Sequence, residues 1–404
     1  MRAIVIGGGI GGLTAAVALT RRGWSVTVLE QAPVLEPVGA GIAVSANALY
    51  ALDSIGAGAA VRRLASIQGD AGIRRRDGKW LTRTSEAQAR ERYGASIVVL
   101  LRATLVGILV DLLPEGALRL GTAVIGIDAD TGTVTTDTGE LSADLVVAAD
   151  GIHSLARRTL FPAHPGPVYA GVTAWRLVTR RPEMDFGATE SWGAGLAFGV
   201  TPLAGDLVYC YASDTVPAGG SAADGSADGS AGGEKAELIR LFGGWHDPIP
   251  QILRNVEPAA ILRHDLYSLD EPLPAFHRGK VALLGDAAHA MTPNLGQGGC
   301  QAMEDAVVLA GLADRPGGLA AYTAARRPRT TRIVARSRAI GRLTRLRNPL
   351  AVALRDTSML LGDRFTRSFM LRRLDDVLGW RPPTPPEPER APRAPDGGGP
   401  ATDG

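Results

Sequence analysis

The sequence opens with MRAIVIGGGIGGLTAAVALTRRGWSVTVLE (residues 1–30), and this stretch decides the fold. The β-branched run Ala3–Ile6 predicts a strand, and the glycine cluster after it predicts a tight turn. The small-residue segment Leu13–Arg22 predicts a helix, and Ser25–Leu29 predicts a second strand that closes on Glu30. This order of strand, glycine turn, helix, strand and acid is typical of a dinucleotide-binding βαβ unit.

The glycines of the turn have separate roles in such a unit. Gly7 allows the tight turn, Gly9 lets the backbone approach a pyrophosphate, and Gly12 permits close packing of the helix on the strand. Unpaired N–H groups and a positive dipole at the helix start favour phosphate. Glu30 is placed to accept hydrogen bonds from ribose hydroxyls. The stretch therefore predicts a bound dinucleotide, without specifying which one.

Composition excludes several classes of protein. The 404 residues are 45% apolar, which suits a large core and not a disordered chain. The formal charge of +2 gives no reason to expect nucleic acid as a ligand. Two cysteines, Cys210 and Cys300, cannot form a disulfide scaffold or a structural zinc site, and the histidines lack metal-ligand spacing. We expect no metal, no cleavable presequence, no membrane span and a cytoplasmic location.

A second motif follows a predicted buried strand, Leu145–Ala149. The strand leads into Asp150 and Gly151, and Ser154 is placed to cap the next helix. Ligands of parallel sheets bind at the carboxyl ends of the strands. On its own, Asp-Gly is an ordinary turn, so this motif gains meaning only beside the others.

The most specific motif begins with another predicted strand, Lys280–Leu284. It delivers Gly285 and Asp286, and a turn with Pro293 then leads to a helix preceded by three glycines, Gly296, Gly298 and Gly299. Glycines let backbone N–H groups reach a flat ring system, and a helix start stabilises negative charge on it. Asp286 is suited to accept hydrogen bonds from a polyol chain.

With these three motifs the chain resembles the class A flavin-dependent aromatic hydroxylases, which are single-component flavoprotein monooxygenases. The resemblance covers roughly residues 1–347. Within the family, the sequence most resembles the group of urate hydroxylase, salicylate hydroxylase and zeaxanthin epoxidase. The segments Pro37–Leu49 and Tyr169–Arg176 also resemble that group. An α/β fold is implied, with a Rossmann-like FAD-binding domain, an antiparallel β-sheet substrate domain and C-terminal helices.

We expect the following segments: FAD binding at 1–70, 96–167 and 271–320, a hairpin joining the substrate domain at 71–95, the substrate sheet at 168–270, and C-terminal helices at 321–380. Low complexity predicts a mobile loop at 217–233 and a disordered tail at 381–404. The assembly is expected to be a monomer or a homodimer.

The resemblance implies FAD as the cofactor. NADPH or NADH would be a transient co-substrate, because the chain shows one nucleotide fingerprint and not two. The residues carried over as cofactor contacts are Gly7, Gly9, Gly11, Gly12, Glu30, Gln31, Ala43, Arg102, Val124, Asp150, Gly151, Asp286, Gly296, Gln297, Gly298, Gly299 and Cys300. Pro293 would lie near the flavin.

The implied activity is monooxygenation. NAD(P)H reduces FAD, O2 adds at flavin C4a, and the hydroperoxide hydroxylates or epoxidises an electron-rich substrate carbon. The flavin carries this chemistry, so no nucleophile–base set is required. Candidate substrate-pocket residues are Arg176, Tyr209 and Tyr211, although Arg176 could equally lie on the surface or between domains. The segment Gly193–Ala212 lacks the arginine of urate-type enzymes, which argues against urate and for a largely apolar aromatic or polycyclic substrate.

Two alternatives stay open. One is an FAD-dependent reductase or dehydrogenase of an isoprenoid-type substrate. The other is a non-catalytic flavoprotein sensor whose arginine-rich helices bind a partner. Ten arginines lie from Arg326 to Arg355, and a solvated helix face is the simpler interpretation of them. We expect a local structural role for His289 and a packing role for Cys300.

Overall fold

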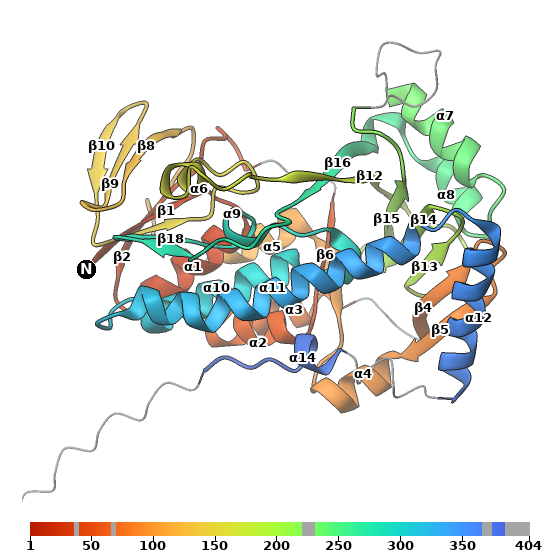
Figure 1. Ribbon diagram of the computed structural model, residues 1–404. Coiled ribbons are helices and arrows are strands. Elements are labelled where there is room, and N and C mark those ends of the chain that lie inside the picture. Colours follow the sequence, from red (N-terminus) through yellow and green to blue (C-terminus); the bar gives the residue numbers. More distant parts are fainter. Residues whose placement is uncertain (36–39, 66–69, 220–230, 366–373, 384–404) are drawn as a thin grey trace, which may run out of the picture.

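The computed structural model describes residues 1–35, 40–65, 70–219, 231–365 and 374–383. Its central sheet, which contains β1, β2 and β18 of Figure 1, has six strands in the order β17-β18-β11-β1-β2-β7. Every neighbouring pair is parallel except β17 with β18. The strands are β1 (Arg2–Ile6), β2 (Ser25–Leu29), β7 (Leu118–Arg119), β11 (Leu145–Ala148), β17 (His277–Arg278) and β18 (Val281–Leu283).

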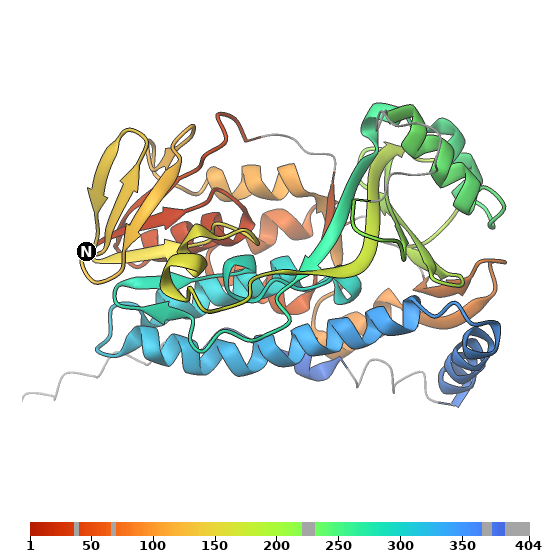
Figure 2. The same cartoon turned by 45° about the horizontal axis from the view of Figure 1, so that its top comes forward.

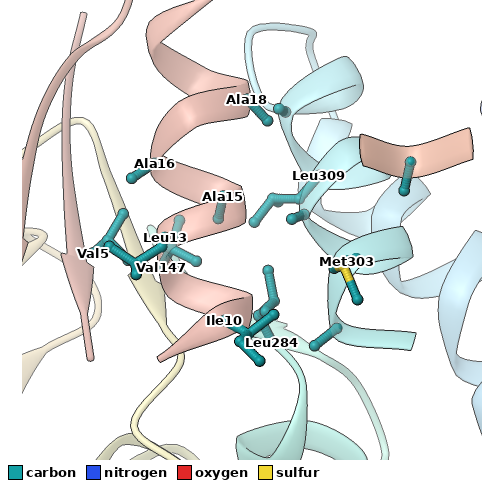
Figure 3. Packing of buried hydrophobic residues seen from close by; sticks show 14 of the residues in the cluster. Val5, Ile10, Leu13, Ala15, Ala16, Ala18, Val147, Leu284, Met303 and Leu309 are labelled. Carbon is teal, nitrogen blue, oxygen red and sulfur yellow. The ribbon is translucent and has the colours of Figure 1, made fainter. Parts of the chain in front are cut away.

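This sheet is buried on both faces, as a parallel sheet covered by helices requires. All of β11 is buried, and so is β1 from Ala3 onward. Helix α1 (Ile10–Thr20) packs between the sheet and α10 (Gly298–Leu312). In Figure 3, Leu13 of α1 points toward the sheet while Ala15 faces α10, so small residues let the two helices approach closely.

A second sheet has seven strands in the order β16-β12-β15-β14-β13-β4-β5. Its neighbours are antiparallel except β13 with β4. The strands are β4 (Asp70–Arg75), β5 (Trp80–Ser85), β12 (Val168–Arg180), β13 (Thr189–Trp192), β14 (Leu196–Leu203), β15 (Leu207–Asp214) and β16 (Leu262–Ser268). Helices α7 (Ala231–Phe242) and α8 (Ile249–Asn255) contribute buried side chains to a core of its own beside this sheet (Figure 2).

Two small sheets and further helices complete the fold. One sheet pairs β3 (Gly41–Val44) with β6 (Val98–Leu101), and the other joins β8 (Val124–Asp128), β9 (Thr133–Thr136) and β10 (Gly139–Ser142). The remaining helices are α2 (Ala46–Ser54), α3 (Gly58–Arg62), α4 (Glu86–Tyr93), α5 (Arg102–Val110), α6 (Leu155–Leu160), α9 (Asp286–His289), α11 (Gly318–Thr344), α12 (Pro349–Phe365) and α14 (Asp375–Leu378). Short 3-10 turns occupy Pro258–Ala260 and Pro293–Leu295. No helix in the part of the chain that the structure describes is long and apolar enough to span a membrane.

The strand–turn–helix–strand prediction for the first thirty residues is confirmed, with one correction. The helix predicted from Leu13 begins at Ile10, so Gly11 and Gly12 belong to its first turn. Both glycines pack closely against neighbouring residues. The predicted hairpin is present as β4 and β5, and β4 joins it to the seven-stranded sheet through β13. Residues 220–230 of the expected mobile loop and 384–404 of the expected tail lie outside the described residues.

Candidate cofactor and substrate site

The turn between β1 and α1 depends on the absence of side chains. Gly7 has a φ of +103°, and a Cβ on it would lie 2.4 Å from the carbonyl oxygen of Ala149. A Cβ on Gly12 would lie 2.0 Å from the carbonyl oxygen of Gly7, and one on Gly11 would lie 2.8 Å from Leu284 Cδ2. Such approaches exclude a side chain. The turn therefore presents bare backbone at the start of α1, where N–H groups lack helical partners.

Glu30 lies beside this turn at the end of β2. Its Oε2 accepts a hydrogen bond from the Gly8 N–H at 2.6 Å, and its Oε1 accepts one from the Ala32 N–H at 2.9 Å. The carboxylate is therefore held at the rim of the glycine turn. Gln31 is exposed next to it, and Val124 is half-buried on β8.

Arg102 lies beside the glycine turn. It is the first residue of α5, and its N–H donates to the carbonyl of Ala40 at 2.9 Å. Its Nη2 lies 3.6 Å from the place where Gly9 would carry a Cβ. A guanidinium next to a helix start reinforces the attraction of that start for an anion.

Asp150 and Gly151 follow β11 behind the turn. The Asp150 Oδ2 accepts a hydrogen bond from the Ala156 N–H at 3.0 Å, whereas its Oδ1 is buried without a partner among the described residues. A buried acceptor without a partner is costly unless a ligand or water supplies a donor. Ser154 caps α6 as predicted, because its Oγ accepts from the Arg157 N–H at 2.8 Å.

Asp286 opens α9 directly after Gly285, whose φ is +63°. Its side chain is accessible from the cavity described below, yet the surrounding protein raises the pKa of the carboxyl. Neighbouring His289 and the guanidinium groups of Arg102 and Arg176 oppose that rise. Asp286 is thus a carboxyl with cations on several sides, suited to a polar ligand.

The segment Gly296–Cys300 leads into α10 opposite Asp286. Gly296 has a φ of +62°, and a Cβ on Gly299 would lie 2.9 Å from Ile42 Cδ1. Gly298 would place its Cβ 3.9 Å from Asp286 Oδ1, so the two motifs lie close together. Cys300 is fully buried, and burial raises the pKa of its thiol to about 11. It packs behind the segment and does not face the cavity.

A cavity of about 830 Å³ lies between these motifs and the seven-stranded sheet. That volume is in the range of small-molecule sites. The residues predicted from the sequence that line it are Ala43, Arg102, Arg176, Tyr209, Tyr211, Asp286, Pro293, Gly296, Gln297, Gly298 and Gly299. Arg176 therefore faces the cavity. The other predicted contacts, namely Gly7, Gly9, Gly11, Gly12, Glu30, Gln31, Val124, Asp150, Gly151 and Cys300, lie outside its lining.

Several polar residues of the cavity were not predicted from the sequence, among them Glu86, Asp270 and Glu190. Glu190 of β13 lines the cavity together with Tyr211. Glu190 lies three positions before the charge-poor segment Gly193–Ala212 from which an apolar substrate is predicted. Alternation along Thr189–Trp192 would have placed Glu190 and Trp192 on one face.

A buried polar network lies under Gly296–Cys300. Arg326 of α11 donates through Nε to Asp305 Oδ1 at 2.6 Å and through Nη1 to Glu304 Oε2 at 2.5 Å. Asp305 Oδ2 lies 2.5 Å from His289 Nε2 and accepts from the Gly285 N–H at 3.0 Å. His289 is thus buried inside this network, where a local structural role was expected for it.

The same network reaches the cavity lining through Asn47. Its Nδ2 donates to Glu304 Oε1 at 2.6 Å and to Gln297 Oε1 at 3.0 Å. The expectation of a solvated arginine face is wrong for Arg326, which is 1% exposed, and for Arg355, which is 5% exposed. Arg326 is turned inward because two carboxylates of α10 lie beneath it.

Comparisons with known proteins agree with this geometry. Residues 1–179 and 270–337 match the FAD binding domain family. The aurachin C monooxygenase/isomerase of Stigmatella aurantiaca is 39% identical over 367 residues, which cover 88% of this chain and 93% of that protein. A FAD-dependent urate hydroxylase of Klebsiella pneumoniae is 34% identical over 350 residues, which cover 84% and 89%.

A solved structure shows the same fold. Klebsiella pneumoniae HpxO complexed with FAD and uric acid superposes with a TM-score of 0.84 at 30% identity, covering 93% of this chain and 97% of that one.

FAD fits the residues described above. The bare backbone at the start of α1 suits a pyrophosphate, the buried Asp150 Oδ1 lacks a donor, and Asp286 faces Gly298 across the cavity rim. The chain therefore belongs to the FAD binding domain family, in the group of class A FAD-dependent aromatic hydroxylases.

Proposed function

We propose that the protein is a monooxygenase that uses NAD(P)H and O2 to hydroxylate or epoxidise an aromatic or polycyclic small molecule. The observation that carries this proposal is the cavity of about 830 Å³, because it joins the Gly296–Gly299 segment to a sheet wall with two tyrosines, Tyr209 and Tyr211. We also propose that it acts in the cytoplasm, as a monomer or a homodimer.

In this proposal the three motifs hold FAD. The Gly7–Gly12 turn, Glu30 and Arg102 would bind the diphosphate and ribose end, and Asp286 and Gly296–Gly299 would bind the ribityl and ring end. Bound FAD supplies the redox chemistry that takes electrons from NAD(P)H and activates O2. Asp150 and Gly151 would serve both the cofactor and the transient nicotinamide.

The sheet residues would orient the substrate and exclude water. The ring of Tyr209 lies over Gly41, whose Cβ would approach it to 2.5 Å, so the sheet closes tightly on β3. Burial raises the pKa of Tyr209 and raises that of Tyr211 further, so both hydroxyls stay protonated at neutral pH. Arg176 adds a cation on the adjacent strand, near Asp286.

The test is oxidation of NAD(P)H by the FAD-loaded protein across a panel of aromatic and polycyclic compounds. We expect at least one compound to raise the oxidation rate by about tenfold or more over the rate without compound. Its product should carry one oxygen-18 atom when the gas phase is labelled O2. Reduction of an isoprenoid compound without O2 uptake would support the dehydrogenase alternative. Salt-dependent partner binding with no oxidation of NAD(P)H would support the sensor.

Arg102→Met is expected to weaken FAD binding by about 10–100-fold, which is the loss of one or two charge-assisted hydrogen bonds. The side chain of Arg102 is exposed, so the free energy of unfolding of the cofactor-free protein should change little. Fluorescence titration with FAD measures the effect. Arg63→Met, which removes an exposed arginine after α3, is the matched control. Equal FAD affinity in the two variants would show that Arg102 does not contribute to FAD binding.

A further inference from the structure

One row of residues crosses the cavity wall in register. Glu190 of β13 pairs with Gly199 of β14, Gly199 pairs with Tyr211 of β15, and Tyr211 pairs with Arg176 of β12. Residues in register on neighbouring strands share a face of the sheet. Glu190, Tyr211 and Arg176 all line the cavity. The row therefore carries a carboxyl at one end, a cation at the other and a phenol between them.

Gly199 explains how Tyr211 lies in this row. A Cβ on Gly199 would lie 2.2 Å from both Cε1 and Cζ of the tyrosine, so the ring covers the bare backbone of β14. This direction carries the hydroxyl toward β13, and the pKa of Tyr211 is raised first by burial and then by the nearby Glu190 carboxyl. Any larger residue at position 199 would push the ring out of the row.

Glu190 has few partners for a carboxyl inside the protein. Burial raises the pKa of the carboxyl, and the neighbouring Trp192 and Tyr211 side chains oppose that rise. No ion pair to Glu190 is present in the described part of the chain. The Trp192 Nε1 is itself buried without a hydrogen-bond partner there.

A carboxyl offers about four lone-pair sites, and the Trp192 and Tyr211 side chains beside Glu190 leave some of them unused. Glu190 is half-buried, so a bound ligand would take water away from the carboxyl, and a donor on that ligand would replace the hydrogen bonds lost to water. A purely structural carboxyl would be expected to end in an ion pair or a complete set of backbone donors. Glu190 instead faces the cavity, where a ligand can reach it.

We propose that Glu190, held beside Tyr211, determines substrate specificity by accepting a hydrogen bond from an N–H or O–H group of the substrate. This inference rests on the proposed function and narrows its substrate class. The substrate is an aromatic molecule with a polar hydrogen on the end that lies away from Arg176 and Asp286. An otherwise identical molecule with that hydrogen replaced by methyl leaves the carboxyl unpaired and binds more weakly.

The experiment compares two probes that differ by this hydrogen, 2-naphthol and 2-methoxynaphthalene. Equilibrium dialysis against the FAD-loaded protein, without NAD(P)H, gives both dissociation constants. We expect the wild type to prefer 2-naphthol by about tenfold or more. Glu190→Leu should reduce the preference to within about twofold. Thr201→Val, which removes a cavity hydroxyl one row away on β14, should keep it.

Two milder variants distinguish the loss of the hydrogen bond from a folding defect. Glu190→Gln keeps an acceptor and should keep part of the preference, while Tyr211→Phe removes only the hydroxyl and should lower it. FAD content and circular dichroism confirm that each variant is folded. A wild type that does not prefer 2-naphthol, including one that binds neither probe, overturns the proposal, and so does a Glu190→Leu protein with the wild-type preference. Dialysis measures binding without turnover. The binding preference can therefore be tested even if the monooxygenase assay shows no activity.

Discussion

Replacing Arg326 by methionine is expected to lower the free energy of unfolding by about 3–5 kcal/mol, the usual cost of removing one partner from a buried ion pair. Glu304 and Asp305 have fully buried side chains, and both depend on this guanidinium. Arg329 also reaches Glu304, at 2.7 Å, so Asp305 loses more of its compensation. Burial would raise the pKa of Asp305, but the neighbouring His289 and Arg326 hold it below its usual value.

Urea unfolding of the cofactor-free protein measures this loss, with Arg332→Met as the matched control. Arg332 lies on the same helix but is exposed, so its variant should stay within about 0.5 kcal/mol of the wild type. The Arg326 variant should also bind FAD more weakly, since the network holds Gly285 and Gln297. Equal stability of the two variants would show that α10 tolerates its carboxylates without Arg326.

Replacing Gly12 by alanine is expected to lower the free energy of unfolding by at least about 3 kcal/mol. This value is the upper end of the usual destabilisation caused by overpacking a core. The new Cβ would lie 2.0 Å from the Gly7 carbonyl oxygen, and that oxygen is main chain and cannot rotate away. Relief requires α1 to move from β1. FAD affinity should then fall by about 100-fold or more, because the backbone that faces the pyrophosphate is displaced.

Gly107→Ala makes the same chemical change with the opposite expected sign. Gly107 is exposed in α5, and a Cβ there meets nothing within 4 Å. Alanine in a helix interior is favoured over glycine by about 0.5–1 kcal/mol, so this variant should be slightly more stable. Urea unfolding and FAD titration measure both variants. A Gly12→Ala protein with wild-type FAD affinity would show that close packing at this turn is dispensable.

The parts predicted well from the sequence are those whose signals are local. The Gly7–Gly12 turn, the strands beside it and the Asp286 segment each combine hydrophobic periodicity with glycines at fixed spacing. Helix α4 was missed although its signal is local too. Ser85 and Gln88 form a capping box, and Gly94 ends the helix with a φ of +75°.

The parts that were not predicted depend on pairing between distant strands. The row of Glu190, Tyr211 and Arg176 exists because β13, β14, β15 and β12 adopt one register, which a linear sequence does not display. Arg326 similarly resembles its solvated neighbours until α10 supplies two carboxylates under it. The residue roles inferred for the cofactor site stay predictions that the variants above address.

The order in which the chain visits its two large sheets limits how this protein can be engineered. The polypeptide passes from the six-stranded to the seven-stranded sheet between β2 and β4, returns between β5 and β7, passes again between β11 and β12, and returns between β16 and β17. The cavity wall is consequently not a contiguous cassette. Transplanting it into a relative to exchange substrate preference requires four splice points, and a chimera that moves only residues 168–270 leaves the β4–β5 hairpin of the recipient to pair with a foreign β13.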